Sequence, residues 1–310
     1  MVLVVGATGL LGTEICRRLT RRGEQVRALI RKTSSPEKVA LLTECGAGLC
    51  VGDLKDTNSL ADACRGVDAI ISTASSTLSR QAGDSIESVD DQGQLNLVEA
   101  AKAAGVDRFV FVSFRHSANL TFPLADAKAH VENAIKALNF TTIQASWFME
   151  IWLSPALGFD YANATARIYG SGTSPVSWDS FQDVEEMCVL TLRHPAAERR
   201  TIEVGGPEPL SPLEVVARFE QIGGRPFKIE QIPEEALRAQ FETATDSMQK
   251  SFAALMLDYS FGDSINSKPI QDEFGIELTS IDKYARRVLE AHPVRMRGMQ
   301  LEHNPTSGDL

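Results

Sequence analysis

The sequence predicts an α/β fold, with a doubly wound parallel sheet followed by a smaller, mostly helical C-terminal lobe. From Val2 to Ala145, short apolar runs alternate with amphipathic stretches, a pattern typical of βαβ units with right-handed crossovers. After Trp147, prolines, glycines and aromatic residues become frequent and the alternation is lost. The 310 residues suffice for one large or two modest domains.

Six buried strands are expected in the first half, each an apolar run followed by turn residues. They cover residues 2–5, 26–30, 48–51, 69–72, 109–112 and 141–145. Leu11, Ile15 and Leu19 recur at helical spacing after the first strand. Further helices are expected at residues 58–64, 89–104, 131–138, 181–192, 212–222, 234–257 and 280–291.

These elements suggest a division of the chain into two parts. Residues 1–150 form the first domain, and residues 173–204 are expected to pack back on it. Residues 151–172 and 205–292 form the lobe, which covers the cleft at the carboxyl ends of the strands, where such sheets bind ligands. Residues 293–310 are polar and irregular and are expected to form a tail.

Composition limits the possible partners and the compartment. A net charge of -10 argues against nucleic acid or an anionic membrane as the main partner. No stretch approaches the roughly 18 apolar residues of a membrane span, and the N-terminus does not resemble a signal peptide. Five cysteines without a C-x-x-C pair fit reduced thiols and no metal site. We therefore expect a cytoplasmic monomer or homodimer.

Three glycines directly follow the first predicted strand. Gly6, Gly9 and Gly12 open the following helix, so Gly6 permits the tight turn, Gly9 lets the backbone approach a phosphate, and Gly12 allows helix and strand to pack closely. A pyrophosphate binds backbone N–H groups at such a helix start. This context predicts a dinucleotide site that includes Thr8, Leu10 and Leu11. The alternative is a structural turn that binds nothing.

The glycine spacing resembles that of the extended and atypical branches of the short-chain dehydrogenase/reductase superfamily, which have a Rossmann fold. Residues 51–54 resemble the turn in which an Asp, here Asp53 beside Leu54, contacts adenine in that superfamily. Residues 109–113 and 182–184 resemble other segments of it, and residues 204–215 resemble the NmrA-like group, within the wider isoflavone-reductase-like set. The resemblance covers about residues 1–225. Thr73 and Ala74 follow the fourth strand and are also expected at the cofactor.

The end of the second strand indicates which dinucleotide binds. An NAD site usually has a carboxylate here, but this chain has Arg31 and Lys32. A guanidinium forms paired hydrogen bonds with a phosphate, so these cations, with Thr8 on the facing turn, favour NADP(H). The alternative is an ordinary solvated pair of charges.

The usual catalytic pair of the superfamily is incomplete. Its Tyr-x-x-x-Lys motif corresponds to residues 124–128, so that Lys128 is present but Leu124 replaces the Tyr, and no tyrosine lies in the first 160 residues. Lys128 is expected to hold the nicotinamide ribose, and burial could lower its pKa enough for proton donation. Ser113 could assist from the end of the fifth strand. The alternatives are a solvated Lys128 and a Ser113 that caps a turn.

A substrate pocket is expected beside the nicotinamide. The segment after the sixth strand is rich in aromatic side chains and would form an apolar wall. We expect Phe148 and Met149 to face the ligand, with Phe148 also near the cofactor. Trp152 belongs to the same candidate pocket, with packing in the lobe as its favoured role. His116 is expected at the mouth of the cleft.

The sequence thus favours an NADPH-dependent reductase that acts on a polarised C=C, C=N or C=O bond of an apolar small molecule without the usual Tyr proton donor. Two alternatives stay open. One is an NmrA-like redox sensor that binds NADP(H) without turnover. The other is an assembly factor that keeps the cofactor site for its structure, as in some atypical members of photosynthetic organisms.

Overall fold

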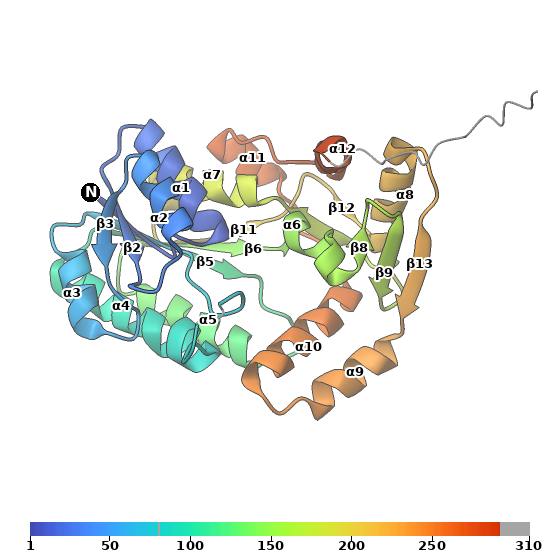
Figure 1. Cartoon of the computed structure of the whole chain (residues 1–310), viewed down its shortest axis with the longest axis horizontal. Coiled ribbons are helices and arrows are strands. Elements are labelled where there is room, and N and C mark those ends of the chain that lie inside the picture. The colour runs from blue at the N-terminus through green and yellow to red at the C-terminus, as the bar shows by residue number, and fades with distance from the viewer. Residues whose placement is uncertain (80, 292–310) are drawn as a thin grey trace, which may run out of the picture.

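The computed structural model describes residues 1–79 and 81–291 and divides into a domain built on a large sheet and a lobe beside it (Figure 1). The tail expected at residues 293–310 lies outside this range. Within the described residues, no helix is both long and apolar enough to span a bilayer.

A seven-stranded parallel sheet forms the centre of the first domain. Its strands are β1 (Val2–Val5), β2 (Val26–Ile30), β3 (Gly48–Val51), β4 (Ala69–Ser72), β5 (Arg108–Phe114), β6 (Phe140–Ala145) and β11 (Arg200–Val204). Their order is β3-β2-β1-β4-β5-β6-β11, which is the Rossmann order with one added edge strand. The predicted doubly wound sheet is confirmed, and its reversal of direction lies between β1 and β4.

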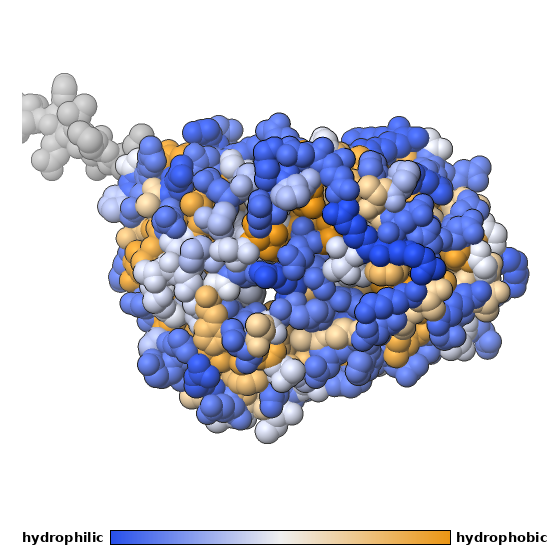
Figure 2. Space-filling view, turned by 180° about the vertical axis from the view of Figure 1, so that it is seen from behind, coloured by the Kyte–Doolittle hydropathy of each residue, from blue (hydrophilic) through white to orange (hydrophobic). Residues whose placement is uncertain are grey.

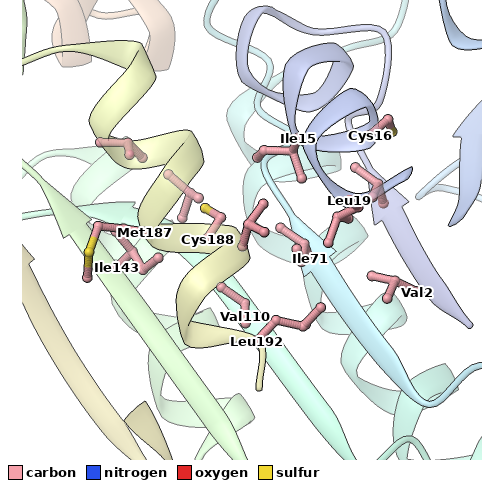
Figure 3. Packing of buried hydrophobic residues seen from close by; sticks show 14 of the residues in the cluster. Val2, Ile15, Cys16, Leu19, Ile71, Val110, Ile143, Met187, Cys188 and Leu192 are labelled. Carbon is pink, nitrogen blue, oxygen red and sulfur yellow. The ribbon is translucent and has the colours of Figure 1, made fainter. Parts of the chain in front are cut away.

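Helices cover both faces of this sheet because successive strand residues point to opposite sides. Val2 and Val4 pack in one apolar cluster, and Leu3 and Val5 pack in the other. The first face carries α1 (Leu10–Arg21), α2 (Pro36–Glu44) and α7 (Phe181–Thr191), and Figure 3 shows α1 and α7 meeting over the strands. The second face carries α3 (Thr57–Cys64), α4 (Gln92–Ala104) and α5 (Pro123–Ile135).

The lobe combines helices with two small sheets. One sheet contains β8 (Phe159–Asp160), β9 (Thr165–Tyr169) and β13 (Lys228–Ile232), and the other contains β7 (Trp147–Phe148), β10 (Val176–Asp179) and β12 (Pro209–Leu210). The helices are α6 (Met149–Trp152), α8 (Pro212–Gly223), α9 (Glu234–Thr243), α10 (Ser247–Phe261) and α12 (Ile281–Ala291). The expectation of a mostly helical lobe therefore missed these strands, since β13 is largely exposed and carries polar residues that lack an apolar pattern.

The helix expected at residues 234–257 is two helices, α9 and α10, which lie side by side (Figure 1). The Asp246 carboxylate accepts hydrogen bonds from the N–H groups of Met248 and Gln249, at 3.0 and 2.9 Å. An Asp at this position stabilises a helix start, so a new helix begins at Ser247. The apolar periodicity of the sequence does not reveal this break.

A second difference concerns helix α11 (Lys268–Phe274), which falls in the range assigned to the lobe. Its Ile270 and Phe274 pack in the same apolar cluster as α1 and α7, and the Phe274 ring lies 4.9 Å from that of His194. This segment therefore packs on the first domain.

Candidate active site

One large cavity, of about 760 Å³, lies between the carboxyl ends of the central strands and the lobe. The surface is hollowed near the middle of the molecule, where the two parts meet (Figure 2). We call the part near β1, β2 and β3 the cofactor end and the part near α6 and α10 the substrate end.

The glycine turn forms the floor of the cofactor end. Gly6 has φ +83°, and a Cβ there would lie 2.7 Å from the N of Ala74 and 2.8 Å from Oγ1 of Thr73. A Cβ on Gly12 would lie 2.2 Å from the O of Gly6. Positions 6 and 12 of the turn therefore require glycine, and the turn brings backbone N–H groups of the α1 start to the cavity. These features fit a pyrophosphate.

The sequence-predicted residues of this turn divide into two groups. Gly6, Thr8, Gly9, Leu10 and Leu11 line the cavity. Gly12 is buried beneath them and serves the close approach of α1 to the turn. The cavity lining also includes four further predicted residues, which are Asp53, Leu54, Thr73 and Ala74.

Arg31 lines the cavity just beyond β2, but Lys32 is exposed and lies outside the lining. Lys38, from the first turn of α2, lines it instead. Sequence analysis missed both α2 and Lys38, since the run of residues 36–44 has a weak apolar periodicity.

A carboxylate that sequence analysis also missed lies against Arg31. Arg31 Nη1 donates to Oδ2 of Asp84 at 2.6 Å, and Lys55 Nζ donates to Oδ1 at 2.6 Å. Ser79 Oγ donates to the same carboxylate. Burial acts to raise the pKa of Asp84, but the hydrogen bonds from Lys55, Ser79 and Arg31 lower it to about 2.

Lys128 is buried where the two ends of the cavity meet. Its Nζ lies 3.4 Å from the O of Val112, 3.9 Å from Oδ1 of Asp90 and 4.8 Å from the centre of the Phe111 ring. Burial lowers the pKa of this ammonium, and the charges of Asp90 and Glu132 act in the opposite direction. A buried lysine near the carboxyl end of a strand can hold a polar ligand group and exchange a proton with it.

Ser113 and Leu124 also line the cavity near Lys128. Leu124 precedes Lys128 by one helical turn and is buried, so an apolar side chain faces the site where the superfamily has its Tyr. The N–H of Leu124 donates to Oγ of Ser251, on helix α10 of the lobe, at 3.1 Å.

His116 does not line the cavity, contrary to expectation. Its Nε2 lies 3.0 Å from Oε1 of Glu132, and Gln144 Nε2 donates to the same carboxyl at 3.0 Å. Burial acts to raise the pKa of Glu132, but its hydrogen bonds, that with His116 foremost, lower it. The carboxylate thus holds the imidazole beside α5.

The substrate end has an aromatic wall. Phe148 and Trp152 line it, while Met149 is fully buried in the core of the lobe. Trp152 thus lines the expected pocket as well as packing in the lobe, but Met149 does not line it, because α6 starts at Met149 and that side chain is buried in the lobe core. Trp152 stacks on Tyr259, with ring centres 4.7 Å apart, and meets Trp147 edge-on at 4.6 Å.

Distant segments complete this end. Trp147, Phe181, Phe252, Leu255 and Met256 add apolar surface. Arg115, Asp258 and Asp263 add charge, with Arg115 bonded to Asp263 and Ser117 to Asp258. Burial raises the pKa of Asp258, and its hydrogen bond with Ser117 opposes this. No signal in the sequence joins Ser117 to a residue 141 positions later.

The strand order, the glycine turn at the reversal point and the buried Lys128 define a dinucleotide-binding protein of the atypical short-chain reductase class. The chain belongs to the NmrA-like family, which it matches over residues 1–286, and this family comprises NAD(P)-binding Rossmann reductases. The resemblance inferred from the sequence is confirmed.

Curated relatives extend over most of the chain. It is 28% identical to a photosystem II assembly factor, Ycf39, of Synechocystis, over 98% of this chain and 95% of the relative. It is 30% identical to an NAD(P)H azoreductase of Xenophilus azovorans, over 84% and 90%. It is also 31% identical to an isoflavone reductase homolog of Zea mays, over 78% and 80%.

Among solved structures, the fold resembles that of an NADPH-dependent quinone oxidoreductase of Escherichia coli in complex with NADPH. The TM-score is 0.75 at 20% identity, and the match covers 93% of this chain and 100% of the other. Named relatives and neighbours of this chain thus include NAD(P)H-dependent oxidoreductases.

Proposed function

We propose that this protein binds NADP(H) and reduces a polarised C=C, C=N or C=O bond of an apolar small molecule. The observation that carries the proposal is that one and the same cavity joins the glycine turn, Lys128 and an aromatic wall. An apolar pocket that opens onto a dinucleotide site, with a few convergent polar groups, is typical of reductases of small molecules.

The residues at the cofactor end would hold the dinucleotide. Gly6, Gly9 and the first N–H groups of α1 suit the pyrophosphate, and Asp53 suits the adenine side of the cavity. Arg31, with Lys38 near it, supplies the positive charge that a 2′-phosphate requires. When bound, NADPH supplies a hydride.

Lys128 and Ser113 are the groups we assign to the chemistry. Lys128 would hold the ribose hydroxyls and donate a proton, since burial weakens its hold on that proton. Ser113 lies in the lining beside it and would donate a hydrogen bond to the polar atom of the acceptor. Leu124 gives no proton in place of the usual Tyr.

The aromatic wall favours a flat, conjugated acceptor. Phe148, Trp152 and Phe252 offer ring surfaces, and aromatic contacts stabilise planar ligands by stacking. The relative named as an NAD(P)H azoreductase and the neighbour named as a quinone oxidoreductase support this class of substrate.

The test is to follow NADPH oxidation by the purified protein with a panel of quinones, azo dyes, enones and imines. We expect turnover with at least one planar acceptor and its loss in Lys128→Met. NADPH binding without oxidation across the whole panel would contradict the reductase assignment.

A second function has specific support. Leu124 replaces the usual proton donor, and a relative that covers 98% of this chain is named as a photosystem II assembly factor. In this proposal the protein binds a partner protein. The bound dinucleotide either stabilises the fold or signals its own redox state to that partner. The same panel distinguishes the two proposals, because an assembly factor or sensor would bind NADPH tightly and oxidise none. A cytoplasmic location stays a prediction.

A further inference from the structure

We propose that Asp84 is an internal competitor for the 2′-phosphate position, so that this protein accepts NADH nearly as well as NADPH. The inference rests on the proposed binding of a dinucleotide at the glycine turn. Asp84 is not among the residues that the sequence motifs identify, which are the glycines of the turn, Asp53 and Lys128.

Asp84 is held by three donors from three separate elements. Arg31 follows β2, Lys55 follows β3, and Ser79 lies in the segment after β4. A guanidinium, an ammonium and a hydroxyl that converge on one anion form a donor set suited to a phosphate. Here the anion is a carboxylate of the chain itself, with only 3% of its side chain exposed.

The position of this carboxylate decides its consequence. In Rossmann folds the residue at the end of the second strand recognises the ribose 2′ position, and in this chain that residue is Arg31. Its backbone N–H donates to Oγ of Ser34 at 2.9 Å, which fixes the turn. Arg31, Ser34, Lys38 and Asp84 line the same end of the cavity.

Asp84 therefore affects the two dinucleotides in opposite directions. A 2′-phosphate placed at Arg31 meets the negative charge of Asp84 and must compete for Arg31 and Lys55. A ribose with free hydroxyls can instead donate a hydrogen bond to a carboxylate, as in sites specific for NAD. Asp84 supplies this acid from the segment after β4, whereas NAD-specific proteins usually supply it from the second strand.

The test compares the affinities of the wild type, Asp84→Asn and Asp84→Ser for NADPH, NADH, 2′,5′-ADP and 5′-ADP by calorimetry. The adenosine phosphates do not reach Lys128, so the readout is independent of turnover. Asp62→Asn, an exposed acid of α3 that pairs with Arg65, is the matched control.

We expect the wild type to prefer NADPH over NADH by less than about tenfold, a difference of about 1.4 kcal/mol. Both Asp84 variants should increase the preference for NADPH and for 2′,5′-ADP by about tenfold or more, whereas Asp62→Asn should leave it unchanged.

Four results would overturn the inference. The first is a wild type that already strongly prefers NADPH. The second is an equal loss of affinity for all four ligands in both Asp84 variants, which would mean that Asp84 only orders the segment after β4. If the wild type and the variants bind none of the ligands, the proposed dinucleotide site fails together with the inference. Binding of NADPH by the wild type with no change in the variants removes the inference alone.

Discussion

The two ends of the cavity are built in different ways. The floor of the cofactor end is a backbone turn, and its glycines shape it because a Cβ at Gly6 or Gly12 would collide with neighbouring atoms. The substrate end is made of side chains from β7, α6, α7 and α10, which are far apart in the sequence. A site formed by backbone tolerates few substitutions, whereas a site formed by side chains can be rebuilt for another ligand.

Both ends combine cations with acids. Arg31 and Lys38 line the cofactor end together with Asp53 and Asp84, and Arg115 lines the substrate end together with Asp258 and Asp263. Cations suit the phosphates of a dinucleotide. The acids of the substrate end, one of them bonded to Arg115, provide hydrogen-bond partners for the polar atoms of an otherwise apolar acceptor.

The largest effect is expected at the backbone-built end. Gly6→Ala should lose dinucleotide binding and about 2–5 kcal/mol of stability, from a left-handed backbone and an overpacked Cβ. Gly23→Ala is the matched control, because Gly23 has φ +81° and no atom within 4 Å of the added Cβ. It should cost only about 1–2 kcal/mol and keep full binding. Thermal unfolding measures the stability of the two variants, and calorimetric titration measures their affinity for NADPH. Equal losses in the two variants would contradict the proposal that Gly6 shapes the dinucleotide site.

The next effect is expected where the ends meet. Lys128→Met should lower kcat by about 100-fold or more, the contribution typical of a positioned proton donor. Lys136→Met, at the exposed end of the same helix, should leave kcat unchanged. The measurement is the steady-state rate with the best acceptor of the panel. An unchanged kcat in Lys128→Met would mean that another group donates the proton.

A smaller effect is expected at the wall of the substrate end. Trp152→Leu should raise KM for a planar acceptor by about tenfold, equivalent to about 1.4 kcal/mol, and leave the NADPH affinity unchanged. Met149→Ala should instead cost about 2–5 kcal/mol of stability with KM unaltered. Acceptor titrations and denaturant unfolding separate these outcomes, and a KM that changes only in Met149→Ala would restore the expectation from sequence.

The smallest effect concerns pH. Burial lowers the pKa of Lys128, so the folded chain binds this proton less tightly than the unfolded chain, whose lysine titrates near its ordinary pKa of about 10.4. Stability of the wild type relative to Lys128→Met should therefore rise with pH between the lowered and the ordinary pKa. Denaturant unfolding of both proteins across this range measures it; a difference that falls with pH would mean that Asp90 outweighs burial.

The sequence was sufficient to predict the sheet, the turn and Lys128 because each depends on local patterns. Apolar runs marked β1 to β6, and Gly6 and Gly12 marked the turn that only glycine can form. Lys32 and Met149 were placed wrongly because successive side chains beyond a strand point in different directions, so that Arg31 and Phe148 line the cavity and the residue after each does not.

The remaining parts depend on contacts between distant residues. Asp84 and Arg31 are 53 positions apart, and Arg115 and Asp263 are 148 apart. No spacing rule relates such pairs. The strands of the lobe were not predicted for a different reason. Strand β13, for example, is exposed and has no apolar pattern.

The hydrogen bond from the N–H of Leu124 to Ser251 limits how chains of this kind can be recombined. An N–H in the first turn of a helix has no partner within that helix, and a buried one left unpaired costs about 1–3 kcal/mol. The helix that carries Lys128 is thus completed by a hydroxyl 127 residues later in the chain. A C-terminal lobe transplanted from another member of the family must bring a hydrogen-bond acceptor to this place.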